Sequence, residues 1–146
     1  MPNYGTGVTS TPAAASGAAW ATFSTGASNR ARIYKLVVTN TQTTYSQVGV
    51  IRSSNTPVAT TSVTPQPYDA ADHASTAVLS TAWSTAPTVG TNYLETFAIG
   101  ASQGSGFLDS WQSDKEITLA TSTWLVIWNT GSGAGAILNV SVAYDE

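Results

Sequence analysis

The sequence predicts an all-β protein, an antiparallel β-sandwich with a jelly-roll-like topology and about eight strands. Three observations predict this fold. Short segments in which apolar and polar residues alternate recur along the chain, as half-buried strands require. Turns rich in Gly, Pro, Ser and Thr separate these segments. No segment has the apolar spacing of three to four residues that is typical of an amphipathic helix.

We expect two parts in the 146 residues, an extended N-terminal arm over residues 1–16 and a single sandwich domain over residues 17–146. The arm is rich in Gly, Thr, Pro and Ala, so it can bury little surface alone. We expect it to order on a partner, with Tyr4 and Val8 as anchors. Removal of the arm should then leave the thermal unfolding of the domain unchanged.

The clearest strand pattern covers residues 32–40, where Leu36 and Val38 share an apolar face. Residues 41–44 are short enough for a hairpin turn, so we expect residues 45–52 to pair with this strand. Further strands are expected at residues 18–24, 58–63, 74–82, 93–101, 107–111 and 116–120.

The most hydrophobic strand is expected at residues 123–129, which contain Trp124 and Trp128. We expect it to be buried on both faces, with both tryptophans in the core. Residues 138–144 alternate between apolar and small or polar side chains, which predicts a half-buried final strand.

Charge and composition exclude several functions. Only 9% of residues are charged, and 23 threonines and 18 serines give the surface a hydroxyl-rich character. The five basic residues are scattered and the net charge is -3, so no nucleic-acid partner is expected. Without cysteine, neither a disulfide nor a thiolate metal site can form. No signal peptide or membrane-spanning segment is predicted, and no membrane partner is expected.

No catalytic site, cofactor or metal is expected. His73 is the only histidine, and the Gly-x-Ser-x-Gly motif of many serine hydrolases is absent. Asp69, Asp72 and His73 could together hold a divalent ion, but the capping of turns explains the same residues more simply. A glycosidase needs two carboxylates at a working separation, which nothing in the sequence fixes. The candidate carboxylates are Glu95, Asp109, Asp114 and Glu116.

Two of the five tryptophans are candidates for an interface. Trp83 and Trp111 lie beside polar turns, where an aromatic ring can contact a protein or stack on a sugar. The sequence pattern does not distinguish between a protein partner and a sugar.

Three stretches resemble a known family. Residues 32–40, residues 63–75 and the segment around Trp111 resemble small β-rich structural proteins of tailed bacteriophages, most closely the capsid decoration (cement) proteins. The chief motif is Pro-x-Pro-(apolar)-Asp-x-x-Asp-x-Ala-Ser at Pro65 to Ser75. The resemblance extends from about residue 17 to the C-terminus.

The resemblance implies a virion component on the capsid exterior that binds the major capsid protein and stabilises the shell. It implies self-association as well, most simply as a trimer, and it brings no catalytic residues. The alternative is a phage tail or fibre protein, or another carbohydrate-binding β-sandwich module. The expected partner-binding residues are Tyr4, Val8, Pro65, Pro67, Tyr68, Trp83 and Trp111.

Overall fold

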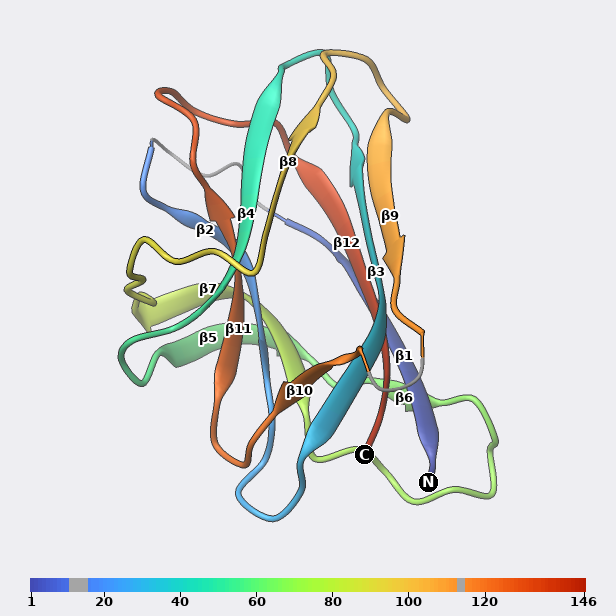
Figure 1. Cartoon of the computed structure of the whole chain (residues 1–146). Coiled ribbons are helices and arrows are strands. Elements are labelled where there is room, and N and C mark those ends of the chain that lie inside the picture. Colours follow the sequence, from blue (N-terminus) through green and yellow to red (C-terminus); the bar gives the residue numbers. More distant parts are fainter. Residues whose placement is uncertain (11–15, 113–114) are drawn as a thin grey trace.

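Two antiparallel β-sheets pack face to face in the computed structural model, which describes residues 1–10, 16–112 and 115–146 (Figure 1). The predicted all-β sandwich is confirmed. Over these described residues the chain forms twelve strands and no helix, where about eight strands were expected. It follows that none of them belongs to a helix able to cross a membrane. The jelly-roll connection stays a prediction.

Sheet A and sheet B contain six strands each. Sheet A has the order β10 (Ile117–Leu119), β3 (Ala31–Asn40), β12 (Leu138–Asp145), β1 (Asn3–Thr9) and β6 (Gln66–Pro67). Strand β9 (Gly106–Ser110) also pairs with β3, at residues 35–39, whereas β10 pairs at residues 31–33. Sheet B has the order β5 (Val58–Val63), β7 (Val78–Thr85), β2 (Ala19–Ser24), β11 (Trp124–Asn129), β4 (Ser46–Arg52) and β8 (Glu95–Ile99).

The hydrophobic core lies between the two sheets. Alternation along the strands directs one set of side chains inward, as the sequence pattern predicts. The largest wholly buried side chains come from both sheets, and Trp20 is the largest of them. Its indole N–H donates a hydrogen bond to the carbonyl oxygen of Ala136 at 2.8 Å, so the one polar atom of the ring is satisfied inside the core.

The hairpin expected from residues 32–40 and 45–52 is wrong. β3 belongs to sheet A and β4 to sheet B, so the chain crosses from one sheet to the other between them. The buried amide of Asn40 fixes this crossing by donating hydrogen bonds to the carbonyl oxygens of Thr44, at 2.8 Å, and Gly100, at 2.9 Å. Both strands have apolar faces, and crossing lets these faces meet across the core instead of lying side by side.

The expected arm is also wrong for the residues that the structure describes. Residues 3–9 form β1, which pairs with β12 along its whole length. In this ladder Tyr4 lies opposite Tyr144. The Tyr4 side chain has no exposed surface, and Val8 packs against the core. Backbone pairing with β12 and burial of the Tyr4 ring therefore hold this Gly- and Thr-rich segment on its own domain. Residues 11–15 lie outside the described residues.

The tryptophans of β11 lie outside the core between the sheets. Leu125 and Ile127 point into that core, whereas Trp124 and Trp128 lie on the outer face of sheet B and are partly buried. Tyr93 of the segment 86–94 lies over Gly49 on this outer face, and Val126, between the two tryptophans, is wholly buried, so β11 is buried on both faces. Burial on both faces was predicted, but the placing of the tryptophans in the core was not correct.

Candidate binding trough

The loop from Pro65 to Ser75 is fastened to the body of the domain. Pro65 is buried, and the backbone N–H of Tyr68 donates to the carbonyl oxygen of Asn3 at 2.8 Å. The Tyr4 hydroxyl donates to the carbonyl oxygen of His73 at 3.1 Å. The buried Ser75 hydroxyl bonds to the hydroxyl of Tyr144 at the far end of the loop. Because both ends and the middle are held, the loop presents Tyr68 in one position.

The carboxylate of Glu146 collects several hydrogen bonds beside this loop. Asn29 donates to it at 2.9 Å, Ser75 at 2.6 Å, and the hydroxyl and backbone N–H of Thr76 donate as well. Partial burial opposes ionisation of the carboxyl, but the hydrogen bonds from Ser75, Thr76 and Asn29 outweigh it and hold the pKa of Glu146 below its usual range. The carboxylate therefore ties the last residue to the loop in its charged form.

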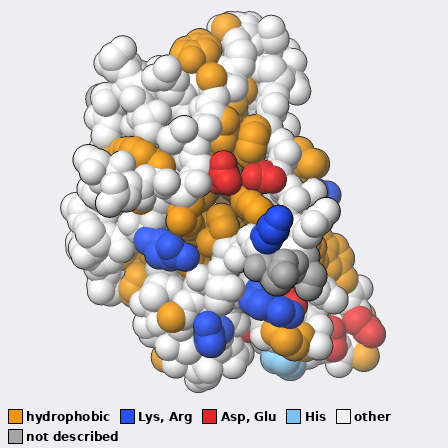
Figure 2. All heavy atoms as spheres, viewed as in Figure 1, with side chains coloured by type: hydrophobic (Ala, Val, Ile, Leu, Met, Phe, Trp, Pro, Cys, Tyr) orange, Lys and Arg blue, Asp and Glu red, His pale blue; other side chains and the backbone are white. Residues whose placement is uncertain are grey.

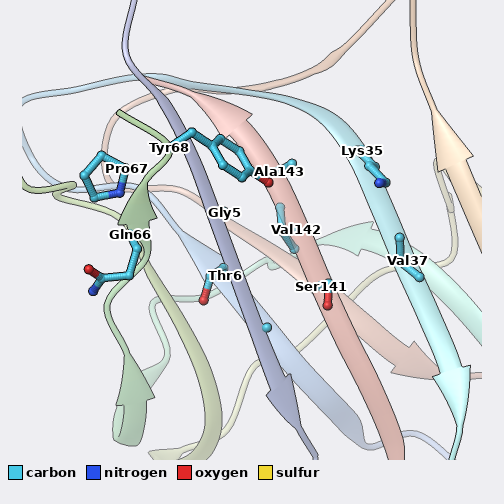
Figure 3. A pocket seen from close by; sticks show the side chains of 11 residues that line it. Gly5, Thr6, Lys35, Val37, Gln66, Pro67, Tyr68, Ser141, Val142 and Ala143 are labelled. Carbon is cyan, nitrogen blue, oxygen red and sulfur yellow. The ribbon is translucent and has the colours of Figure 1, made fainter. Parts of the chain in front are cut away.

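Next to the loop, the outer face of sheet A is hollowed (Figure 3). Two adjoining hollows, of about 400 and about 350 Å³, share Gly7 and Ser141, and we call them together the trough. Strands β1, β12 and β3 form its floor. The first hollow is lined by Gly5, Thr6, Gly7, Lys35, Val37, Gln66, Pro67, Tyr68, Ser141, Val142 and Ala143. The second is lined by Gly7, Val8, Thr9, Thr39, Asn139 and Ser141.

Two glycines of β1 make the trough possible. A Cβ atom at Gly5 would lie 2.6 Å from the hydroxyl oxygen of Tyr68, too close for the ring to stay where it is. A Cβ atom at Gly7 would lie 2.9 Å from the hydroxyl oxygen of Ser141. Glycine at these positions keeps the floor low and lets the Tyr68 side chain reach across β1 (Figure 3).

The trough is almost uncharged. Lys35 is its one charged lining residue, and the lining contains no carboxylate. In the described part of the chain the ion pair joins Arg32 and Asp145 at 2.5 Å, and Lys35 has no carboxylate within ion-pair distance. The pKa of Tyr34 is raised, mainly by burial of its side chain and to a smaller extent by the electrostatic effect of the nearby Tyr68.

The seven expected partner-binding residues divide between the trough and other places. Tyr68 and Pro67 line the first hollow and Val8 the second. Burial leaves Tyr4 no surface to offer a partner. Pro65 is buried as well, and it holds the loop that carries Tyr68.

The two expected interface tryptophans do not form an exposed platform. The indole N–H of Trp83 donates to the Thr22 hydroxyl at 3.0 Å on the outer face of sheet B. Trp111 is partly buried and packs against the core. Tyr68 and Tyr45 are instead the aromatic residues with large exposed fractions in the described chain, at 68% and 51%.

Asp69 and Asp72, which were weighed with His73 as ligands of a divalent ion, lie in a turn. The carboxylate of Asp69 accepts a hydrogen bond from the backbone N–H of Ala71 at 2.9 Å, and the carbonyl oxygen of Asp69 accepts one from the N–H of Asp72 at 3.0 Å. Among the described residues, no three His, Asp or Glu side chains are arranged to hold a metal ion. The turn-capping interpretation of Asp69 is therefore confirmed.

Two of the four candidate carboxylates occupy matching places on facing sheet edges. Phe97 of β8 and Phe107 of β9 stack across the open side of the sandwich, with ring centroids 3.9 Å apart. Glu95 lies two residues before Phe97, and Asp109 lies two residues after Phe107. Figure 2 shows this side, where hydrophobic and acidic side chains border a hollow. Of the other two, Glu116 precedes β10 and Asp114 is outside the described residues.

Sequence reasoning missed most of the trough lining, including Lys35, Gly7 and Ser141. The sequence contains a signal for them. Gly5 and Gly7 are two residues apart on β1 and so share one face, and Ser141 and Ala143 share one face of β12 in the same way. Small residues on the same face of two strands indicate a low floor only when the strands are known to be neighbours. That pairing joins the two ends of the chain and is invisible in local patterns.

Comparison of the chain with protein-family models, with curated proteins and with solved structures gives no match.

Proposed function

We propose that this chain is a virion structural protein, a capsid decoration protein that binds the major capsid lattice from outside and stabilises the shell. One observation carries the proposal, the uncharged edge strand β5. It supports attachment by strand pairing, in which main-chain hydrogen bonds supply much of the affinity.

β5 is an open edge of sheet B. All six of its residues are exposed, and Val58 and Val63 at its ends are 51% and 39% exposed. No charged residue occurs in residues 53–68. Its pairing with β7 is irregular at three places, one of them at Thr60, and these irregularities bend the edge without adding a charge. An exposed neutral edge is a liability for a free protein, because it invites pairing with other chains.

Several other edge strands are protected in ways that β5 is not, although the edge of β1 at residues 6–9, beyond the short β6, is uncharged as well. β8 carries Glu95, β9 carries Asp109, and β6 is two residues long and contains Pro67. Charges, prolines and short length are common means of discouraging edge pairing. The contrast supports β5 as the edge that a partner covers.

A partner bound to the assembled shell stabilises that shell by mass action, since it does not bind the separated subunits in the same way. The proposed partner is the major capsid protein, and the proposed location is the capsid exterior. In Figure 2 the charged side chains gather in the middle and lower part of the view, and the uncharged remainder of that face supports packing among neutral neighbours. The chain itself is proposed to associate as a homo-oligomer, most simply a trimer.

The test adds a charge to the proposed edge. Ser62→Lys places an ammonium group on β5, whereas the control Gln47→Lys places one at an exposed position of β4, an inner strand of sheet B. In co-sedimentation with capsids, Ser62→Lys should bind on the order of tenfold more weakly, and the control should bind like the original protein.

Both variants should retain the melting temperature of the free protein, because both positions are exposed. Full capsid binding by Ser62→Lys would place the attachment elsewhere. Light scattering at micromolar concentration tests self-association, and a strict monomer both free and on the particle would contradict the trimer.

A further inference from the structure

We propose that the trough is a second binding site, separate from capsid attachment, that takes an extended acidic glycan. The trough runs across the middle of sheet A, from Tyr68 to Asn139, and it is long enough for several sugar rings. Its ligand follows from what its walls and floor can and cannot bind.

A peptide gains little from this surface. β12 and β3 have strand neighbours on both sides, and β6 pairs with β1 at Tyr4 and Gly5. The edge left open at residues 6–9 of β1 lies at the rim of the trough, so a peptide lying in the floor finds no strand edge to which it could add. The floor also lacks a deep apolar pocket for a side-chain anchor, because Gly7 and Ser141 occupy its middle. A ligand here must bind through side chains and ring faces.

Tyr68 provides a ring face. Its side chain is 68% exposed, although its hydroxyl lies close above Gly5 and its backbone N–H is bonded to Asn3. The aliphatic C–H face of a sugar ring packs well on an aromatic ring that is exposed and already fixed. Since the loop is held before binding, stacking costs little conformational entropy.

The rest of the trough provides hydrogen-bonding groups that suit sugar hydroxyls. The Thr9 hydroxyl donates to the side-chain oxygen of Asn139 at 2.7 Å, which orients this pair at the far end. Ser141 lies exposed in the middle and Gln66 lies on the wall below Tyr68 (Figure 3). Hydroxyl and amide groups of this kind can both donate to and accept from a glycan.

Lys35 determines the charge of the ligand. Its ammonium group is exposed, faces the first hollow and has no described carboxylate within ion-pair distance. With no carboxylate in the lining, the trough is locally positive on a chain whose net charge is -3. A uronic or other carboxylated sugar placed beside Lys35 complements that charge.

Affinity electrophoresis tests the inference with two defined polymers. Native gels cast with alginate, a polymer of uronic acids, should retard the full chain, whereas gels cast with neutral dextran should not. Tyr68→Ala should weaken alginate binding on the order of tenfold through loss of stacking. Lys35→Gln should weaken it about threefold and remove most of its salt dependence.

Matched controls separate the trough from the rest of the surface. Tyr45→Ala removes another exposed tyrosine and Lys115→Gln another exposed lysine, and both should bind alginate like the original protein. Ser141→Trp should block the trough and abolish retardation. Because Ser141 is exposed, an unchanged melting temperature will show that this variant folds.

Several results would overturn the inference. They are mobility that is unaffected by alginate, equal retardation of Ser141→Trp, and retardation by dextran alone. Retention of peptides from the capsid protein in the trough, blocked by Ser141→Trp and unaffected by alginate, would assign the site to a protein ligand instead.

Discussion

The ring of Tyr4 stacks on the ring of Tyr144, with centroids 5.4 Å apart and planes at 22°. The two residues are also direct partners in the β1–β12 ladder. Phe23 of sheet B meets the Tyr144 ring edge-on at 4.7 Å, so one aromatic cluster joins the first strand, the last strand and the opposite sheet.

The first prediction follows from this cluster. Tyr4→Ala removes a wholly buried ring and should lower the free energy of unfolding by about 3–5 kcal/mol. In a chain of this size the melting temperature should fall by roughly 10 °C. Tyr45→Ala, at an exposed tyrosine, should change stability by no more than about 0.5 kcal/mol. Equal melting curves for Tyr4→Ala and the original protein would show that β1 does not stabilise the domain and acts as an arm.

The second prediction concerns acid. The pKa of Glu146 is lowered in the folded protein, so its contribution to stability is present above the unfolded pKa, roughly 4.3, and is lost as the pH falls through the folded value. Urea denaturation should therefore show Glu146→Gln to be less stable than the original protein at pH 7. The difference should narrow steadily towards pH 3. A difference that is independent of pH would mean that the carboxylate charge does not matter.

The third prediction tests the segment that covers the outer face of sheet B. A Cβ atom at Gly49 would lie 2.5 Å from the ring of Tyr93, so Gly49→Ala should destabilise the fold by about 1–3 kcal/mol. Tyr93→Ala should remove most of the clash. In a double-mutant cycle, Gly49→Ala should therefore cost less in the Tyr93→Ala background. Additive effects would show that the ring moves aside without cost.

The fourth prediction concerns the loop that carries Tyr68. Ser75→Ala removes the partner of the Tyr144 hydroxyl and one partner of Glu146, which should cost about 1–3 kcal/mol. Amides of residues 65–75 should exchange with deuterium faster than in the original protein. Ser84→Ala, at an exposed serine of β7, is the matched control and should leave exchange in this loop unchanged.

The strands that local alternation predicts are found close to their expected places. Leu138, Val140, Val142 and Tyr144 are buried as the period of two requires, and Asn139 and Ser141 are exposed. The pattern records which side of a strand is apolar, because burial acts on every second residue. It contains no information on which strand lies beside which.

The errors come from that missing information. A short connection such as residues 41–44 is compatible with a hairpin and with a crossing between sheets, and Asn40 alone does not distinguish the two. In the same way, β1 looked too poor in apolar residues to fold, because its stability comes from pairing with β12 and from one ring. The trough was missed for the same reason, since its floor joins residues from both ends of the chain.

The order of strands in sheet A has a consequence for synthesis. β12 lies between β1 and β3, and the two ends of the chain are neighbours in Figure 1. During translation β1 is made well before its ladder partner, which spans residues 138–145. Until that partner is made, Tyr4 lacks the Tyr144 ring on which it stacks, and the sparsely charged nascent chain carries unpaired strands. The ladders that join β1 to the rest of sheet A must therefore wait for β12, which lies between β1 and β3.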